Sequence, residues 1–149
     1  MSLEQKVMTE LKAAMKAKDQ AALRSLRAIK SALLLAKTDG SGAEMTEDKE
    51  IKLLQKLVKS RKDSLEIYEK QGREDLAVTE REEIAVISQF LPKQMDSAEL
   101  EAFIKGIVEQ TGASGMKDMG KVMGMASKQL AGKADGKTIS TIVKGLLAG

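Results

Sequence analysis

Apolar residues recur every three or four positions along most of this chain, which is the period of an amphipathic α-helix. A first run extends from about Leu3 to Lys18, and a second follows Asp19, a typical N-cap residue. The expected buried positions are Leu3, Val7, Leu11 and Met15 in the first run and Ala22, Leu26, Ile29, Leu33 and Ala36 in the second. No segment alternates apolar and polar residues as a strand would. The pattern therefore predicts an all-α protein.

Two further helices are predicted in the N-terminal part. Thr46, followed by two acidic residues, opens the longest one, which Gly72 ends, and another runs from about Glu74 to Phe90. Their expected core positions are Ile51, Leu54, Val58, Leu65, Tyr68, Leu76, Ile84, Ile87 and Leu91. The tract from Thr38 to Gly42 is predicted to be a flexible tip.

The only proline, Pro92, follows the fourth predicted helix directly and cannot continue its hydrogen-bond ladder. Asp96 and Glu99 then form a capping-box pattern that starts a new helix, which Gly112 ends. Two more helices are expected, from about Gly115 to Ala131 and from about Lys137 to Leu147. We therefore predict a four-helix N-terminal domain, residues 1–94, and a three-helix C-terminal domain, residues 95–149.

The amino-acid composition argues against several kinds of catalytic and binding site. The chain has no cysteine and no histidine, so disulfides, thiolate zinc sites and the commonest general base are unavailable. Aromatic residues make up 2% of the chain, which disfavours base stacking on single strands. No catalytic or metal-binding constellation is recognisable, and we expect no cofactor and no metal.

Lysines and glycines combine in the C-terminal domain. Lys117, Lys121, Gly124 and Lys128 lie at i, i+4, i+7 and i+11, so one helix through them would place three cations and a bare backbone patch on one stripe. From Gly115 onward there are six lysines and two acids, net +4, whereas residues 1–114 sum to −1. Lysines attract a phosphate chain, and a glycine between them lets it approach closely.

The turn from Gly132 to Lys137 resembles a phosphate-binding loop, but it has three residues between its glycines where the Walker A motif needs four. We therefore expect no nucleotide site. The turn still predicts a generic anion site, formed by backbone N–H groups at the start of the last helix with Lys133 and Lys137 beside them.

Three other features of the sequence can be interpreted as either structural or functional. The methionines Met116, Met119 and Met123 fit a core stripe better than a partner-binding surface. The spacing of Gly120 and Gly124 permits either tight packing or ligand approach. The basic groups Arg24, Arg27 and Lys30, and Lys59 to Lys62, fit salt-bridged surfaces, with Arg61 predicted to pair with Glu80 or Glu83 because it interrupts an apolar stripe.

Several segments, in order along the whole chain, match one known family: Leu23–Arg27 with Lys30, Lys59–Ser64, Tyr68–Glu69, Gly72–Leu76, Phe90–Gln94, Asp118–Met123 and Gly132–Lys137. In these segments the chain resembles the YqeY family, whose members are free-standing relatives of the tail region of one subunit of the glutamyl/aspartyl-tRNA amidotransferase. The resemblance implies an all-helical fold with a small three-helix tail domain, and a connection to tRNA. The catalytic parts of the amidotransferase lie in domains and subunits that this chain does not contain.

We therefore expect a non-catalytic accessory protein that binds tRNA or another structured RNA. The expected contacts are Lys117, Lys121, Lys128, Lys133 and Lys137, with Gly120 and Gly124 allowing close approach. The first alternative is an interaction module that docks on an aminoacyl-tRNA synthetase or amidotransferase, for which an exposed apolar patch on the first two helices would be evidence. The second, by resemblance only, is a carbon-nitrogen ligase with glutamine as amide donor. The charged N-terminus lacks a secretory h-region and no apolar run reaches membrane-spanning length, so we expect a cytoplasmic protein without membrane contact.

Overall fold

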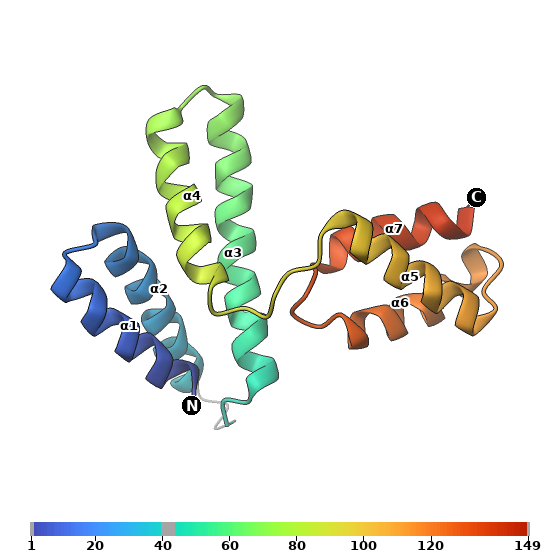
Figure 1. Ribbon diagram of the computed structural model, residues 1–149, viewed down its shortest axis with the longest axis horizontal. Coiled ribbons are helices and arrows are strands. Elements are labelled where there is room, and N and C mark those ends of the chain that lie inside the picture. Colours follow the sequence, from blue (N-terminus) through green and yellow to red (C-terminus); the bar gives the residue numbers. More distant parts are fainter. Residues whose placement is uncertain (1, 40–43, 149) are drawn as a thin grey trace. The chain divides into compact units, whose positions relative to one another are not determined.

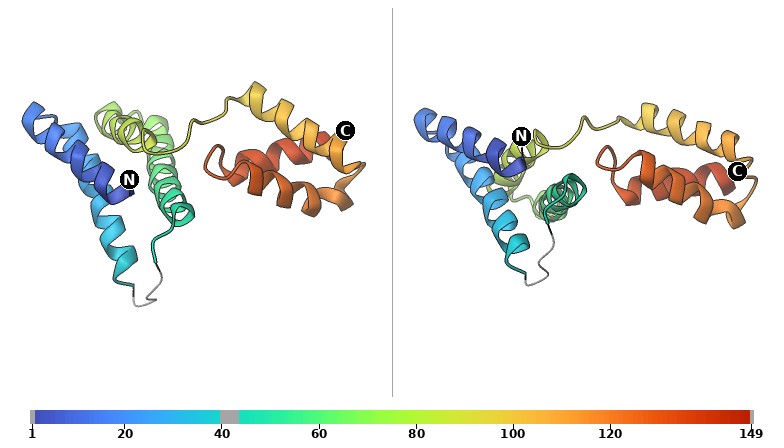
Figure 2. Two further views of the ribbon diagram at one scale, coloured as in Figure 1. Left: turned by 60° about the horizontal axis from the view of Figure 1, so that its bottom comes forward. Right: turned by 90° about the horizontal axis from the view of Figure 1, so that it is seen from below.

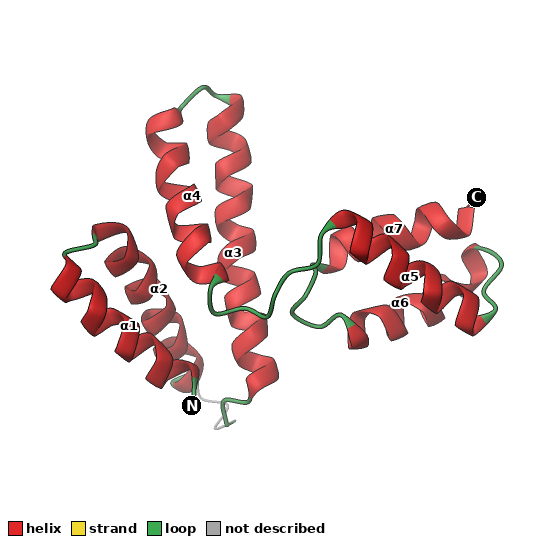
Figure 3. Cartoon of the chain, viewed as in Figure 1, coloured by secondary structure: helices red, strands yellow, loops and turns green. Residues whose placement is uncertain are grey.

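The computed structural model describes residues 2–39 and 44–148, and it is built from helices (Figures 1 and 3). No strand occurs within those ranges, so the predicted all-α class is confirmed. The elements are α1 (Leu3–Ala17), α2 (Gln20–Lys37), α3 (Glu47–Lys70), α4 (Glu74–Ser88), α5 (Ser97–Thr111), the 3-10 helix η1 (Met116–Asp118), α6 (Met119–Gln129) and α7 (Gly136–Ala148).

Most helix starts lie where the capping residues predict them. The side chains of Asp19, Thr46 and Asp96 each accept a hydrogen bond from a backbone N–H in the first turn of the helix that follows. Ser2 caps α1 in the same way, in a capping box with Gln5. Of the tip predicted between α2 and α3, residues 40–42 lie outside the described residues.

The chain divides into two compact units between Leu91 and Pro92. In the first, α1 and α2 form one hairpin, α3 and α4 form another, and α2 packs against α4 (Figure 1). Its core contains Leu3, Val7, Leu11, Ala14, Leu23, Leu26, Ile29, Leu33, Leu54, Val58 and Ile87.

Met15 is a correction to the expected core, because its side chain is 51% exposed and Ala14 is buried in its place. A helical turn has 3.6 residues, so successive steps of four from Leu3 rotate gradually away from the core side. A step of three residues, from Leu11 to Ala14, brings the side chain back to the core side of the helix.

The second unit is a bundle of α5, α6 and α7, in which α6 runs back along α5 and α7 runs back along α6 (Figure 2). Its core contains Leu100, Ile104, Ile107, Val122, Ala126, Leu130, Ile139, Val143 and Leu147. The connecting segment belongs to this unit as well. The Gln94 side-chain amide donates to the Gly132 carbonyl over 2.6 Å, and the Met95 N–H donates to the Lys133 carbonyl over 3.1 Å.

Candidate nucleic-acid interface

The segment before α6 is not the continuous α-helix that the lysine spacing predicts. Met116–Asp118 form a 3-10 turn, in which the Asp118 N–H donates to the Gly115 carbonyl over 3.0 Å. The Asp118 carboxylate also accepts the Ser114 N–H over 3.1 Å. These local bonds compete with α-helical ones and tighten the chain here. Lys117 therefore precedes the α-helix, and the expected stripe is continuous only from Lys121 to Lys128.

Helix α6 has two chemically different sides. Val122 and Ala126 are fully buried and face α5 and α7. The exposed positions are Gly120, Lys121, Gly124, Ser127, Lys128 and Gln129. The solvent side of α6 therefore consists of small residues, cations and one terminal glutamine, without an acid.

The two glycines of α6 do not mediate packing within the unit. A Cβ atom built on Gly120 or Gly124 would meet no heavy atom within 4 Å outside the adjacent chain and the helix backbone. Of the two readings of this spacing, tight packing within the unit is therefore excluded, and an open backbone surface remains.

The lysines beside these glycines are available to a ligand. All five candidates, Lys117, Lys121, Lys128, Lys133 and Lys137, are exposed. The ion pairs of Arg24, Lys37, Arg61, Lys70, Arg73 and Arg81 all join side chains of the first unit, and none of them occupies Lys117, Lys121 or Lys128.

The turn between α6 and α7 is the segment in which we expected an anion site. Gly132 is buried and has φ of 79°, a left-handed conformation that favours glycine. The Asp135 carboxylate accepts the Thr138 N–H over 2.7 Å and so caps α7. The protein's own carboxylate thus takes one of the backbone N–H groups that we expected an anion to use, and Lys133 and Lys137 lie exposed near it in the sequence.

The methionines divide between core and surface. Met119 and Met123 are partly buried against the core of the second unit, as the core reading predicts. Met116 lies in the 3-10 turn and is exposed, which contradicts its assignment to the core stripe. Met116 does not share the buried side of Met119 and Met123 because the 3-10 turn interrupts the α-helical period on which that assignment depended.

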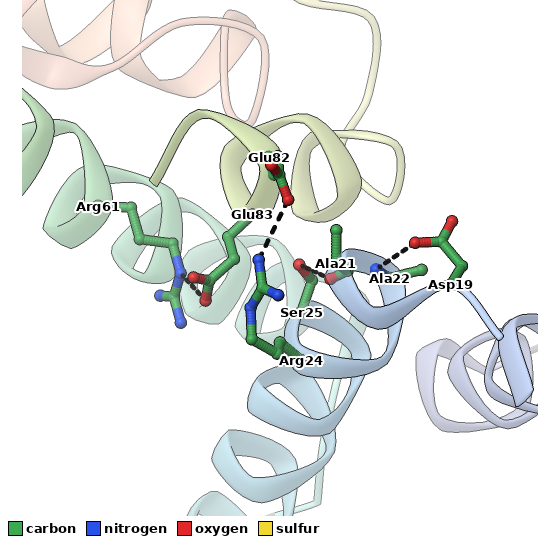
Figure 4. A network of polar contacts seen from close by, with 8 residues as sticks. All are labelled: Asp19, Ala21, Ala22, Arg24, Ser25, Arg61, Glu82 and Glu83. Atoms are coloured by element: carbon green, nitrogen blue, oxygen red, sulfur yellow. Dashed lines mark hydrogen bonds and ion pairs between the residues drawn. The ribbon is translucent and has the colours of Figure 1, made fainter. Parts of the chain in front are cut away.

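The basic groups of the first unit contain two structural arginines (Figure 4). Arg61 Nε lies 3.3 Å from Glu83 Oε1, with 17% and 14% of the two side chains exposed, and Arg61 also donates to the Leu57 carbonyl. The predicted pairing of Arg61 is therefore confirmed. Arg24 Nη2 lies 3.2 Å from Glu82 Oε2. Burial raises the pKa of the nearby Glu80, as does the charge of Glu83, and Arg61 opposes both.

Among residues 2–39 and 44–148, no group of three or more acidic residues could hold a metal ion. None of the helices in these ranges combines the length and apolarity needed to cross a membrane.

Sequence reasoning missed two small residues on the candidate interface. Ser127 and Ala131 are exposed and lie seven and eleven positions after Gly120. That spacing was readable in the sequence and continues the small-residue side of α6 toward and just past its C-terminal end.

Three curated relatives share the name "Altered inheritance of mitochondria protein 41, mitochondrial". The protein from Vanderwaltozyma polyspora is 32% identical over 74% of this chain and 63% of its own length. Those from Pyrenophora tritici-repentis and Lachancea thermotolerans are 27% and 31% identical, over 87% and 68% of this chain and 71% and 55% of their lengths. The chain thus spans less than two thirds of two of these relatives.

These names correct the expectation of a cytoplasmic location, since proteins similar to this chain are named as mitochondrial. The expectation was wrong because the two sequence patterns on which it was based, a secretory h-region and a membrane-spanning apolar run, do not identify a compartment. A sequence profile described as "Yqey-like protein" matches residues 4–147, nearly the whole chain and both compact units. The chain therefore belongs to the family of Yqey-like proteins.

Proposed function

We propose that this protein is a non-catalytic accessory protein that binds structured RNA, with tRNA as its main ligand, through the solvent side of α6. Lys117, Lys121 and Lys128 contact phosphates, and the glycines let the sugar-phosphate backbone approach the helix. Lys133 and Lys137 extend the basic track beyond the end of α6. Choosing tRNA among structured RNAs rests on the resemblance to the tail region of the amidotransferase subunit.

The observation that carries the proposal is the open space over Gly120 and Gly124. A glycine inside a helix costs roughly 0.8–1.0 kcal/mol of stability relative to alanine. Close packing would explain this cost, but no side chain of the unit contacts these positions. Gly106 and Gly145 are open in the same way, so the proposal depends on the combination that α6 presents: two open glycines on the same exposed side as Lys121 and Lys128, where a ligand can come close to the helix backbone.

The lysines supply the complementary charge. Lys121 and Lys128 are seven residues apart, so their Cα atoms are separated by about 10 Å along α6. Long lysine side chains at that spacing reach phosphates on both sides of the small residues between them. Because lysines act as point charges on flexible stems, such contacts hold the backbone without reading base sequence.

The test is a titration of fluorescently labelled tRNA at several salt concentrations. The triple variant Lys117→Gln, Lys121→Gln, Lys128→Gln should bind more weakly, and each lost phosphate contact should lower the slope of log affinity against log salt by roughly 0.7–0.9. The matched control replaces Lys93, Lys105 and Lys144, which are exposed lysines of the same unit, with glutamine. Equal loss in both triple variants would mean that net charge alone drives binding, and an unaffected α6 variant would reject the proposed surface.

A further inference from the structure

The α1–α2 hairpin has a second surface, remote in sequence from α6, that combines apolar and basic residues. A small groove of about 80 Å³ lies between the two helices and is lined by Glu4, Val7, Met8, Lys30, Leu33, Leu34 and Lys37. Leu34 is 62% exposed at its edge. Met15 lies two turns beyond Met8 on α1 and extends the apolar strip along the hairpin.

Cations follow the α2 side of this groove. Lys30 and Lys37 line it, and Arg27 lies one turn before Lys30 on the same side of α2. Lys37 forms an ion pair with Glu4. The two ion pairs of this hairpin, Arg24 with Glu82 and Lys37 with Glu4, do not involve Arg27 or Lys30.

The net positive charge of the first unit is concentrated in the α1–α2 hairpin. Residues 3–37 contain eight basic and three acidic residues, net +5, whereas residues 47–88 contain nine basic and eleven acidic residues, net −2. An apolar ligand with negative flanks therefore complements the groove between α1 and α2 better than a neutral or basic one.

We propose that the groove between α1 and α2 docks an acidic amphipathic helix of a partner protein. Two antiparallel helices offer a third helix a groove parallel to their axes, and its apolar side chains lie against Met8, Leu33 and Leu34. The methionine adapts its shape to the incoming side chains. Acidic residues on the flank of the partner helix pair with Arg27 and Lys30.

The size of the surface sets the length of the partner segment. From Arg27 to Lys37 the axis of α2 rises about 15 Å, which corresponds to about three turns of a docked helix. A probe peptide of about 14 residues covers this length with an extra turn for its ends. Leucines at every third or fourth position and glutamates on the flanks give it the required pattern.

The experiment measures binding of this fluorescein-labelled acidic peptide to the full-length protein by anisotropy. Leu34→Asp should weaken binding by about tenfold or more, because a large apolar contact is lost. Leu35→Asp is the matched control: Leu35 is 71% exposed on α2 but does not line the groove, so its replacement should leave affinity unchanged. The double variant Arg27→Glu, Lys30→Glu should no longer bind the acidic peptide. It should instead bind a peptide in which lysines replace the glutamates.

Several outcomes would overturn the proposal. One is equal binding of the acidic and the lysine peptide to the parent protein, or no binding of either. Another is dimerisation of the parent in sedimentation that Leu34→Asp abolishes, which would assign this surface to a second copy of the chain. Loss of tRNA binding in the Arg27 and Lys30 variant, with peptide binding unchanged, would assign the cations to nucleic acid. Thermal melting of each variant verifies that it is folded.

Discussion

Replacing Gly124 with alanine should stabilise the protein and weaken its binding of RNA. A Cβ atom at this position meets nothing within 4 Å, so the new methyl group causes no clash within the unit. The variant should recover roughly 0.8–1.0 kcal/mol of helix propensity. For a chain of this size, that raises the melting temperature by about 4 °C. Far-UV circular dichroism measures this shift.

The same methyl group should obstruct a bound RNA backbone. Inserting a methyl group into a close contact costs about 1–3 kcal/mol, which corresponds to a loss of affinity of roughly 5- to 150-fold. Anisotropy of labelled tRNA at a fixed salt concentration measures the loss.

Gly145→Ala is the matched control for both effects. Gly145 is also an exposed glycine inside a helix, with no atom within 4 Å of an added Cβ, but it lies on α7. This variant should gain the same stability and bind tRNA like the parent. If Gly124→Ala also binds like the parent, the glycine is not a contact point and RNA does not approach the helix backbone there. A lowered melting temperature would instead show that this side of α6 is not open.

Three further predictions concern stability and the division of the chain. Glu83→Gln should destabilise the protein by about 1–3 kcal/mol in urea unfolding, because the mostly buried Arg61 loses its carboxylate; full stability in this variant would contradict a structural role for the pair. The hydrogen bond from the Glu99 N–H lowers the pKa of Asp96 in the folded protein. The cap therefore stabilises the protein fully at a pH above the ordinary aspartate pKa, and this stabilisation is lost as the pH falls through the lowered pKa of the folded protein. Asp96→Asn should keep the cap and remove that part of the acid sensitivity in melting curves measured between about pH 2 and 6. Limited proteolysis should cut between Leu91 and Asp96 before it cuts inside α6, and early cleavage within α6 would argue against two separately folding units.

Local sequence signals were sufficient for most of the fold. The caps at Asp19, Thr46 and Asp96 depend on side chains bonding to backbone N–H groups three positions away, so they are readable without tertiary information. The apolar period that follows each cap identifies the buried side of the helix. Arg61 could be placed because a charge that interrupts such a stripe requires an acidic partner nearby.

The candidate site was harder to predict because it depends on competition between local bonds. Periodicity alone joined Lys117 to α6, but the bonds made by Gly115 and Asp118 produce a 3-10 turn instead. Periodicity also could not decide whether Gly124 packs or lies open, because that depends on which side of α6 faces α5 and α7. The Asp135 cap was readable in principle, since the acid stands three residues before the N–H that it accepts.

The most direct test of the proposed function is a lysine footprint of the unmodified protein with and without tRNA. An amine-acylating reagent labels exposed lysines, and mass spectrometry measures the labelling at each position. We expect tRNA to protect Lys121 and Lys128 on α6 most strongly, while Lys105 on α5 and Lys144 on α7 stay reactive. Equal protection of all four lysines, or protection confined to the α1–α2 hairpin, would contradict the proposed interface.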